Sequence, residues 1–215
     1  MNKTKRITTI AMLSSIAYIF TLIGHFLPIY FNDFLRYDPK DAIIAISGFT
    51  LGPLSALIIS VAVSVLEAIT ISTTGIIGCL MNILSSATFA CVSAFIYKRI
   101  KSINGALAGL ILSSLLTVGA MLLWNYLVTP AYMKVPREAV EAMLVPVFLP
   151  FNFIKCCLNS ALTMLLYKPC VNAMRRVGLV PRGEGGVKYS IKPWVIVCSV
   201  AVIALMIVLF ICLKS

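Results

Sequence analysis

Residues 147–167 read VFLPFNFIKCCLNSALTMLLY, a mostly apolar run. A helix of about 20 residues rises about 30 Å, which is enough to cross the hydrocarbon core of a bilayer. The run nevertheless carries four polar side chains, those of Asn152, Lys155, Asn159 and Thr163. At about 100° per residue these four fall within about 80° of one another, so the spacing predicts one polar stripe along one face of the helix.

Lys155 is the one Lys or Arg that the pattern of apolar runs does not place in a loop or tail. An ionisable side chain at such a depth is costly, and it normally faces a partner group, a ligand or water inside the bundle. The stripe alone leaves two interpretations open. It is either one wall of a site for a polar ligand, or a structural seam of salt bridges and hydrogen bonds between helices.

The composition indicates an all-α polytopic membrane protein. Of 215 residues 60% are hydrophobic and only 12% are charged, and the mean hydropathy is +1.02. A soluble domain of this size cannot bury so much apolar surface. The net charge of +11 comes from short basic clusters between apolar runs, without an aromatic-interleaved basic face, which argues against nucleic-acid binding. Seven scattered cysteines, no C-x-x-C pair and a single histidine predict no metal site.

Apolar runs at about 7–27, 42–51, 54–72, 78–97, 106–128, 145–167 and 194–213 predict seven helices crossing the cell membrane. With the N-terminus in the cytoplasm, the inner segments hold 12 of the 18 Lys and Arg residues and the outer segments hold 5. This bias supports a cytoplasmic N-terminus and an outer C-terminus if the last helix spans. The short second run ends at Gly48-Phe49-Thr50-Leu51-Gly52-Pro53, which predicts a tight inner turn.

The chain divides into three predicted parts. Residues 1–177 form a six-helix core, residues 178–193 a basic, Gly-rich cytoplasmic linker, and residues 194–215 an additional, lipid-facing helix. The first helix contains Ala11 and Ser15, a small-xxx-small pair that lets another helix approach closely. The pair serves either internal packing or an external partner.

The predicted outer segments are rich in aromatic and polar residues. The first loop reads HFLPIYFNDFLRYDPK over residues 25–40, and its aromatic residues form either an interfacial belt or a lid that stacks on a planar ligand. Residues 67–82 read EAITISTTGIIGCLMN, which suggests irregular backbone lining a cavity at the outer face. Asn82 is then a cavity residue or only a hydrogen bonder at a helix end. Asn125, between Trp124 and Tyr126, is a third polar candidate near that face.

Motifs for chemistry or ATP hydrolysis are missing from the sequence. It has no G-x-x-x-x-G-K-[ST] loop, no G-x-S-x-G elbow and no H-E-x-x-H helix, and one histidine leaves little for general acid–base work. The sequence therefore predicts a non-enzymatic membrane protein with an outward polar pocket and no ATPase of its own.

Several strings in the chain are similar to those of a known family. They are Tyr37-Asp38-Pro39-Lys40-Asp41, Gly48-Phe49-Thr50-Leu51-Gly52-Pro53-Leu54, Gly78-Cys79-Leu80-Met81-Asn82, Asn125-Tyr126 and Leu149-Pro150-Phe151-Asn152-Phe153-Ile154-Lys155. Over roughly residues 5–175 the chain resembles the substrate-binding S component of energy-coupling-factor (ECF) vitamin transporters, most closely the riboflavin-specific members.

The resemblance implies a six-helix core that binds riboflavin from outside as a transported ligand, not as a cofactor. It implies a coupling membrane protein with two ATPase subunits as the partner, docking on the first helix at Ala11 and Ser15. It also implies that Asn125, Asn152 and Lys155 hydrogen-bond the flavin ring, and that the first outer loop closes over the pocket.

The chemistry of these side chains suits that ligand. Asn offers a donor and an acceptor and Lys offers donors, which together match the uracil-like edge of isoalloxazine. The aromatic side chains of Phe34, Tyr37, Trp124 and Tyr126 suit the ring faces. Asn82, Thr73 or Glu67 suits the ribityl tail. The predicted ligand-binding set is Tyr37, Asp38, Asp41, Glu67, Asn82, Trp124, Asn125, Tyr126, Asn152 and Lys155.

The sequence also departs from the family pattern. Val63-Ser64 stands where family members tend to carry a Lys-Asn pair, no Asp-Pro precedes Asn82, and the seventh helix exceeds the six-helix plan. Two alternatives therefore stay open. The ligand is another heterocyclic vitamin, such as thiamin or a deazapurine precursor, or the chain is a membrane scaffold in which Lys155 forms an ion pair with Glu67.

Overall fold

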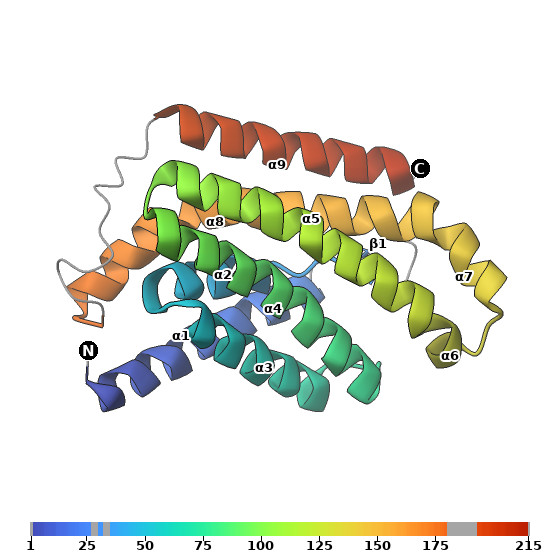
Figure 1. Cartoon of the computed structure of the whole chain (residues 1–215), viewed down its shortest axis with the longest axis horizontal. Coiled ribbons are helices and arrows are strands. Elements are labelled where there is room, and N and C mark those ends of the chain that lie inside the picture. The colour runs from blue at the N-terminus through green and yellow to red at the C-terminus, as the bar shows by residue number, and fades with distance from the viewer. Residues whose placement is uncertain (1, 27–29, 32–34, 180–192, 215) are drawn as a thin grey trace.

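The chain forms a bundle of long helices with its two termini at opposite ends (Figure 1). The computed structural model describes residues 2–26, 30–31, 35–179 and 193–214. The elements in chain order are α1 (Lys3–Phe26), β1 (Tyr30–Phe31), β2 (Leu35–Arg36), α2 (Lys40–Leu51), α3 (Pro53–Thr70), α4 (Gly75–Ile100), α5 (Ile103–Leu127), α6 (Thr129–Met133), α7 (Arg137–Met143), the π-helical turn η1 (Leu144–Phe148), α8 (Leu149–Arg176) and α9 (Pro193–Lys214).

The membrane-length helices confirm the predicted class but not the predicted number of spans. Six helical segments of the described chain are long and apolar enough to cross a membrane. The second apolar run is the exception, because α2 has 12 residues and therefore rises only about 18 Å. The prediction of seven spanning helices is wrong at this element.

The helix α2 is instead an internal element. Every residue from Lys40 to Phe49 is buried, so α2 presents no face to lipid. The chain reaches its start through a two-stranded antiparallel hairpin in which Tyr30 pairs with Arg36 and Phe31 with Leu35. Extended backbone and a half-length helix together replace a full span, and they bring the polar start of α2 into the bundle.

The turn predicted after this helix is confirmed. The helix α2 ends at Leu51 and α3 begins at Pro53, with Gly52 between them at a φ of 94°. That backbone conformation favours glycine because a Cβ would be strained there. Proline suits the first turn of α3, where its missing N–H costs no hydrogen bond.

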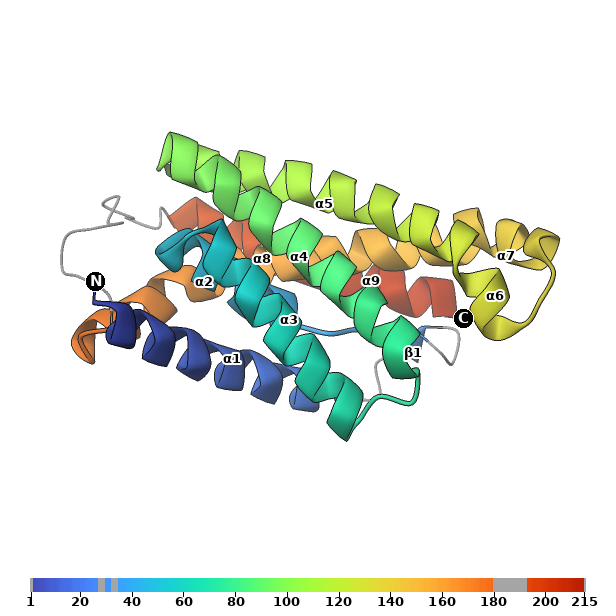
Figure 2. The same cartoon turned by 60° about the horizontal axis from the view of Figure 1, so that its bottom comes forward.

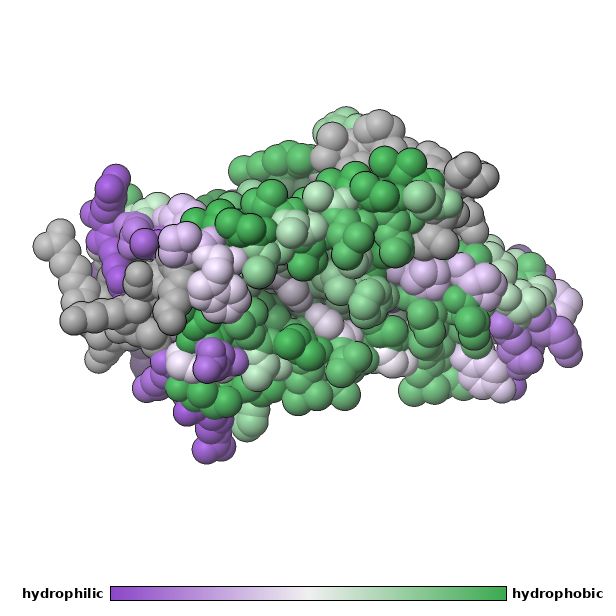
Figure 3. Space-filling model, turned by 90° about the horizontal axis from the view of Figure 1, so that it is seen from above, coloured by the Kyte–Doolittle hydropathy of each residue, from purple (hydrophilic) through white to green (hydrophobic). Residues whose placement is uncertain are grey.

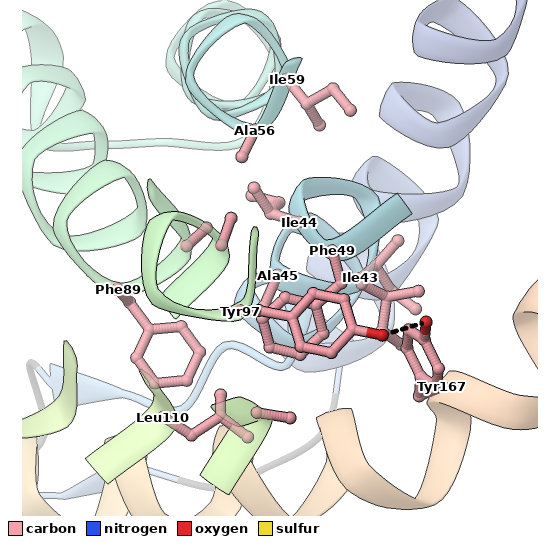
Figure 4. Packing of buried hydrophobic residues seen from close by; sticks show 14 of the residues in the cluster. Ile43, Ile44, Ala45, Phe49, Ala56, Ile59, Phe89, Tyr97, Leu110 and Tyr167 are labelled. Atoms are coloured by element: carbon pink, nitrogen blue, oxygen red, sulfur yellow. Dashed lines mark hydrogen bonds between the residues drawn. The ribbon is translucent and has the colours of Figure 1, made fainter. Parts of the chain in front are cut away.

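The larger apolar core of the described chain surrounds α2 (Figure 4). Three aromatic rings meet there, since Phe49 lies 4.6 Å from the Tyr97 ring and 6.0 Å from the Tyr167 ring, measured between centroids. The two tyrosine hydroxyls are 3.0 Å apart and hydrogen-bonded. This cluster joins α2, α4 and α8, the three helices that also position the polar site.

The face of the bundle drawn in Figure 3 is mostly apolar over its middle and polar towards both ends. Large hydrophobic side chains on α3, α4, α5 and α9 are exposed, for example Leu54, Ile76, Ile111 and Val197. A soluble protein rarely exposes so much contiguous apolar surface, whereas a lipid bilayer covers it. The chain is a multi-pass membrane protein, and which end faces the cytoplasm stays a prediction from the basic loops.

Two further expectations are modified by the structure. The predicted irregular backbone over residues 67–82 is confined to 71–74, because α3 continues to Thr70 and α4 begins at Gly75. The last helix, α9, is not wholly lipid-facing. It packs along α8 (Figure 2) and buries Val195, Ser199 and Met206 against the bundle.

Candidate functional site

The polar stripe predicted on residues 147–167 lies on one buried face of α8. Asn152, Lys155, Asn159 and Thr163 are all buried. The stripe begins just after η1, where Leu149 donates its N–H to the Leu144 carbonyl, five residues back. Pro146 lies within this turn and Pro150 follows it in the first turn of α8. Neither has an N–H to continue an ordinary helical ladder. Within the described chain, the side-chain amide of Asn152 donates to the Phe148 carbonyl at 2.8 Å.

Lys155 faces the start of α2 and the middle of α4. Its Nζ lies 3.4 Å from Asp41 Oδ2 and donates to Ser85 Oγ at 3.3 Å. Both distances are long for a charge-assisted hydrogen bond, which is typically about 2.7–2.9 Å. The side chain also keeps 11% of its surface exposed. The predicted pairing of Lys155 with Glu67 is wrong, because the carboxylate beside Lys155 is that of Asp41.

Asp41 is the centre of this polar cluster. It stands in the first turn of α2, where a negative charge interacts favourably with the helix dipole. Ser86 donates to Asp41 Oδ1 at 2.5 Å, and the Asn159 amide lies 3.5 Å from Asp41 Oδ2. Side chains from α4 and α8 therefore converge on one carboxylate of α2.

The residues before α2 are held against α8 through Asn159. The Tyr37 hydroxyl donates to Asn159 Oδ1 at 3.0 Å, and the Asn159 amide donates to the Asp38 carbonyl at 3.2 Å. Burial raises the pKa of the Tyr37 phenol, and the Asp41 and Asp38 carboxylates raise it further. The hydroxyl therefore stays protonated and able to donate.

A second buried lysine corrects the sequence analysis. Lys40 was expected in an outer loop, yet only 1% of its side chain is exposed. Its Nζ forms ion pairs with Asp38 and with Glu67 Oε2, the latter at 2.5 Å. The Lys40 backbone N–H also donates to Asp38 Oδ1 at 3.0 Å. This charge cluster fastens the start of α2 to the end of α3.

Gly24 of α1 allows the segment Tyr37–Pro39 to lie close against α1. A Cβ at this position would lie 2.9 Å from Pro39 Cδ and 3.0 Å from the Tyr37 carbonyl oxygen. Only glycine allows α1 and this segment to meet without a shift of one of them. The segment Tyr37–Pro39 is thus fixed from three sides, by α1, α3 and α8.

The hydrogen bonds of Asn125 on α5 do not include the Lys155 cluster. Among described residues, Asn125 donates to the Met121 carbonyl at 2.7 Å and accepts from the Thr129 hydroxyl at 2.9 Å. Trp124 and Tyr126 on either side of it are half-buried, and the Arg137 guanidinium lies 5.7 Å from the Tyr126 ring centroid.

Asn82 of α4 is half-buried and stands three and four residues before the site residues Ser85 and Ser86. That spacing places Asn82 on their helix face, one turn nearer the start of α4. The structure therefore brings together Tyr37, Asp38, Asp41, Lys155 and, through Lys40, Glu67. Phe34, also considered for the ring faces, lies outside the described residues.

The predicted ligand-binding set omitted four residues that belong to the connected cluster. Asn159 is part of the α8 stripe, so its periodicity was the available signal. Ser85 and Ser86 follow Asn82 at helical spacing, which was a weaker signal. Lys40 had none, because a lysine after Asp38-Pro39 is typical of a loop.

The small residues proposed for docking lie on the open side of α1. Ala11 and Ser15 are both exposed, and the Ser15 hydroxyl is occupied by the Ala11 carbonyl at 3.1 Å. The internal-packing explanation therefore fails for these two residues within the described chain. Two exposed small side chains one turn apart allow another helix to approach the backbone of α1 closely.

The chemistry of the cluster is that of binding. It offers ammonium, carboxylate, amide and hydroxyl groups from four elements in a mostly apolar surround. Among the described residues no group of three or more His, Cys, Asp or Glu side chains is placed to hold a metal ion. The groups suit recognition of a polar edge on an otherwise apolar ligand.

Comparison with known proteins gives consistent matches. The family model described as "ECF transporter, substrate-specific component" matches residues 5–167. Riboflavin transporter RibU of Staphylococcus aureus (strain TCH60) is 29% identical over 183 residues, covering 82% of this chain and 96% of the relative. Riboflavin transporter FmnP of Bacillus subtilis (strain 168) is 28% identical over 185 residues, covering 80% and 97% respectively.

A solved structure matches at a similar level. It is described as "Structure and mechanism of the S component of a bacterial ECF transporter". It superposes with a TM-score of 0.68 at 28% sequence identity, and the match covers 81% of this chain and 100% of the other.

Proposed function

The chain belongs to the family of substrate-specific components of ECF transporters, and on that premise we propose that it captures riboflavin at the outer side of the cell membrane, using the cluster around Lys155 and Asp41. The two relatives that match over nearly their whole length are named as riboflavin transporters. Members of this family are membrane subunits that bind a substrate for transport.

The observation that carries the proposal is the contrast between the two buried lysines. Lys40 is 1% exposed and has two carboxylate partners, Asp38 and Glu67. Lys155 is 11% exposed, and its one carboxylate lies at 3.4 Å. An ammonium group has three N–H donors, so Lys155 retains donor capacity and accessible surface for a ligand, whereas Lys40 has the surroundings of a structural ion pair.

The flavin edge suits these groups. Its two carbonyl oxygens are acceptors and its ring N–H is a donor, so it needs donors flanking an acceptor. Lys155 supplies donors, and the amide of Asn152, three residues before it on the same face, supplies a donor and an acceptor. Asn125 is a third candidate, because its bonds to Met121 and Thr129 leave one amide N–H and one lone pair of its oxygen for a ligand. The half-buried rings of Tyr37, Trp124 and Tyr126 suit the ring faces.

Uptake needs energy that this chain does not supply, because it has no phosphate-binding loop. We therefore propose that it works with a coupling membrane protein and two ATPase subunits, and that the coupling protein docks on Ala11 and Ser15. Exposure of that small-residue surface supports this assignment. Gly24 of α1 faces the segment before α2, whereas Ala11 and Ser15 are exposed, so docking on those two residues leaves that segment uncovered.

The test is a titration of the purified, detergent-solubilised protein with riboflavin, followed by quenching of flavin fluorescence. We expect saturable binding by the wild-type protein. Lys155→Met should lose it, because methionine keeps the length of the side chain without its donors. Lys168→Met is the matched control, since Lys168 is exposed on the same helix, and it should bind like the wild type.

A panel of vitamins separates the alternatives. Thermal protection by thiamin or a deazapurine in place of riboflavin would keep the family function and refute the assigned ligand. If no small molecule protects the fold, and Lys155→Met/Asp41→Asn is as stable as the wild type, the pair is a structural element and the transport proposal fails. Joint replacement of a buried pair is often tolerated, so stability alone does not decide.

A further inference from the structure

The helix α9 has one face that is buried against the rest of the protein. Residues Val195, Ser199 and Met206 are buried, and Val202, between them at helical spacing, is half-buried. They form a single stripe that packs on α8, while the flanking residues Val197, Leu205 and Val208 are exposed. A helix held only by lipid would show no such one-sided burial.

The stripe contacts the back of the site. Met206 forms an apolar cluster with Ile154 and Leu158 of α8, and Tyr37 packs against this same cluster. Ile154 and Leu158 directly precede Lys155 and Asn159 in the sequence. The α9 side chains therefore support the outer side of the helical turns whose inner side carries the polar stripe.

The same Tyr37 belongs to the polar network. Its ring packs against the α8–α9 cluster, and its hydroxyl donates to Asn159 at 3.0 Å. Asn159 in turn contacts Asp41, the ion-pair partner of Lys155. A continuous series of contacts thus leads from α9 to the ammonium group.

The helix α9 lies outside the part of the chain that the family shares. The family model ends at residue 167, and the solved S component matches over its full length while covering 81% of this chain. Figure 1 shows α9 and α1 at opposite sides of the bundle, so α9 leaves the docking surface of α1 uncovered.

We propose that α9 is a built-in brace that positions Tyr37 and α8 and thereby slows release of the bound ligand; this inference rests on the proposed function. Tyr37 and the turn around Asn159 must separate if the segment before α2 is to move away from the site. Because Met206 and Val202 pack behind both, that separation also disrupts an apolar contact. The brace therefore lowers the dissociation rate of the ligand more than it changes the association rate.

The experiment compares full-length variants of α9 in riboflavin association and release, measured by stopped-flow fluorescence. Met206→Ala/Val202→Ala removes packed side chains, and Leu205→Ala/Val208→Ala removes exposed ones from the same helix. We expect the packed variant to release riboflavin about five- to tenfold faster, a size typical of coupling between contacting residues. Association should change less than about twofold, and the exposed variant should match the wild type.

A double-mutant cycle tests the path through Tyr37. Tyr37→Phe already removes the hydroxyl contact. Adding Met206→Ala/Val202→Ala to Tyr37→Phe should therefore raise the release rate less than about twofold above that of Tyr37→Phe alone. Wild-type release rates in the packed variant, or effects that simply multiply, would overturn the brace.

The same cycle in ligand-free protein, read as melting temperature, is independent of the ligand. If the combined variant lowers the melting temperature by less than the sum of the two separate decreases, the result supports the brace. If the decreases simply add, the brace is rejected. If the wild-type protein bound no flavin, the proposed function would fail. The ligand-free cycle would still test whether α9 positions Tyr37 and α8.

Discussion

Replacing Lys40 with methionine is expected to destabilise the ligand-free protein strongly. The change removes the ammonium group that pairs with Asp38 and Glu67, whose side chains are only 15% and 16% exposed. Removing one partner of a buried ion pair typically costs about 3–5 kcal/mol, because the other charge is left buried and uncompensated. At about 2–4 °C per kcal/mol for a chain of this size, the melting temperature should fall by about 6–20 °C.

The assay is thermal unfolding of the detergent-solubilised protein without ligand, with exposed Lys98→Met as the control. The triple variant Lys40→Met/Asp38→Asn/Glu67→Gln removes the uncompensated charges and should recover part of the loss, because a neutral amide costs less to bury than an unpaired charge. Asparagine at position 38 also keeps the oxygen that accepts from the Lys40 backbone N–H. A single variant that melts within about 2 °C of the wild type, or a triple variant no more stable than the single one, would refute the reasoning.

Three further predictions concern other parts of the structure. Gly24→Ala should weaken flavin affinity about tenfold in a binding titration by displacing the segment before α2, whereas Gly119→Ala, with open space around its Cβ, should not. Ala11→Trp should leave flavin binding unchanged but reduce flavin uptake by cells and co-purification of the coupling protein, unlike Leu123→Trp on the lipid-facing side of α5. Tyr97→Phe should lower the free energy of unfolding by about 0.5–1.5 kcal/mol by removing one buried hydrogen bond, with flavin affinity unchanged.

Local periodicity was sufficient to predict the inner face of α8. Four polar residues at helical spacing in an apolar run define a stripe, and the structure buries all four. The Gly-Pro turn after α2 was equally predictable, because a positive φ and a missing N–H are properties of single residue types. What these features share is that each is determined by residues within a few positions of one another.

The internal position of α2 was harder to predict. Its apolar run, residues 42–51, was too short for a span, and this was the one warning in the sequence. Residue spacing places Lys40 in a loop, since nothing near it in the sequence indicates that Glu67, 27 residues away, is a partner. Pairings over such separations depend on how helices pack, which residue spacing does not encode. For the same reason Asp41, and not Glu67, proved to be the partner of Lys155.

The charge balance of the buried cluster bears on which ligand it suits. Lys40 and Lys155 bring two positive charges, and Asp38, Asp41 and Glu67 bring three carboxyl groups, so the fully ionised cluster carries a net charge of −1. Burying an anionic ligand beside it would add charge of the same sign at low dielectric, where repulsion is weakly screened. A neutral heterocycle adds no net charge and still uses the spare donors of Lys155. On this charge balance we expect the cluster to bind an uncharged heterocycle, such as the riboflavin ring, more readily than a ligand that places a negative charge beside Lys155.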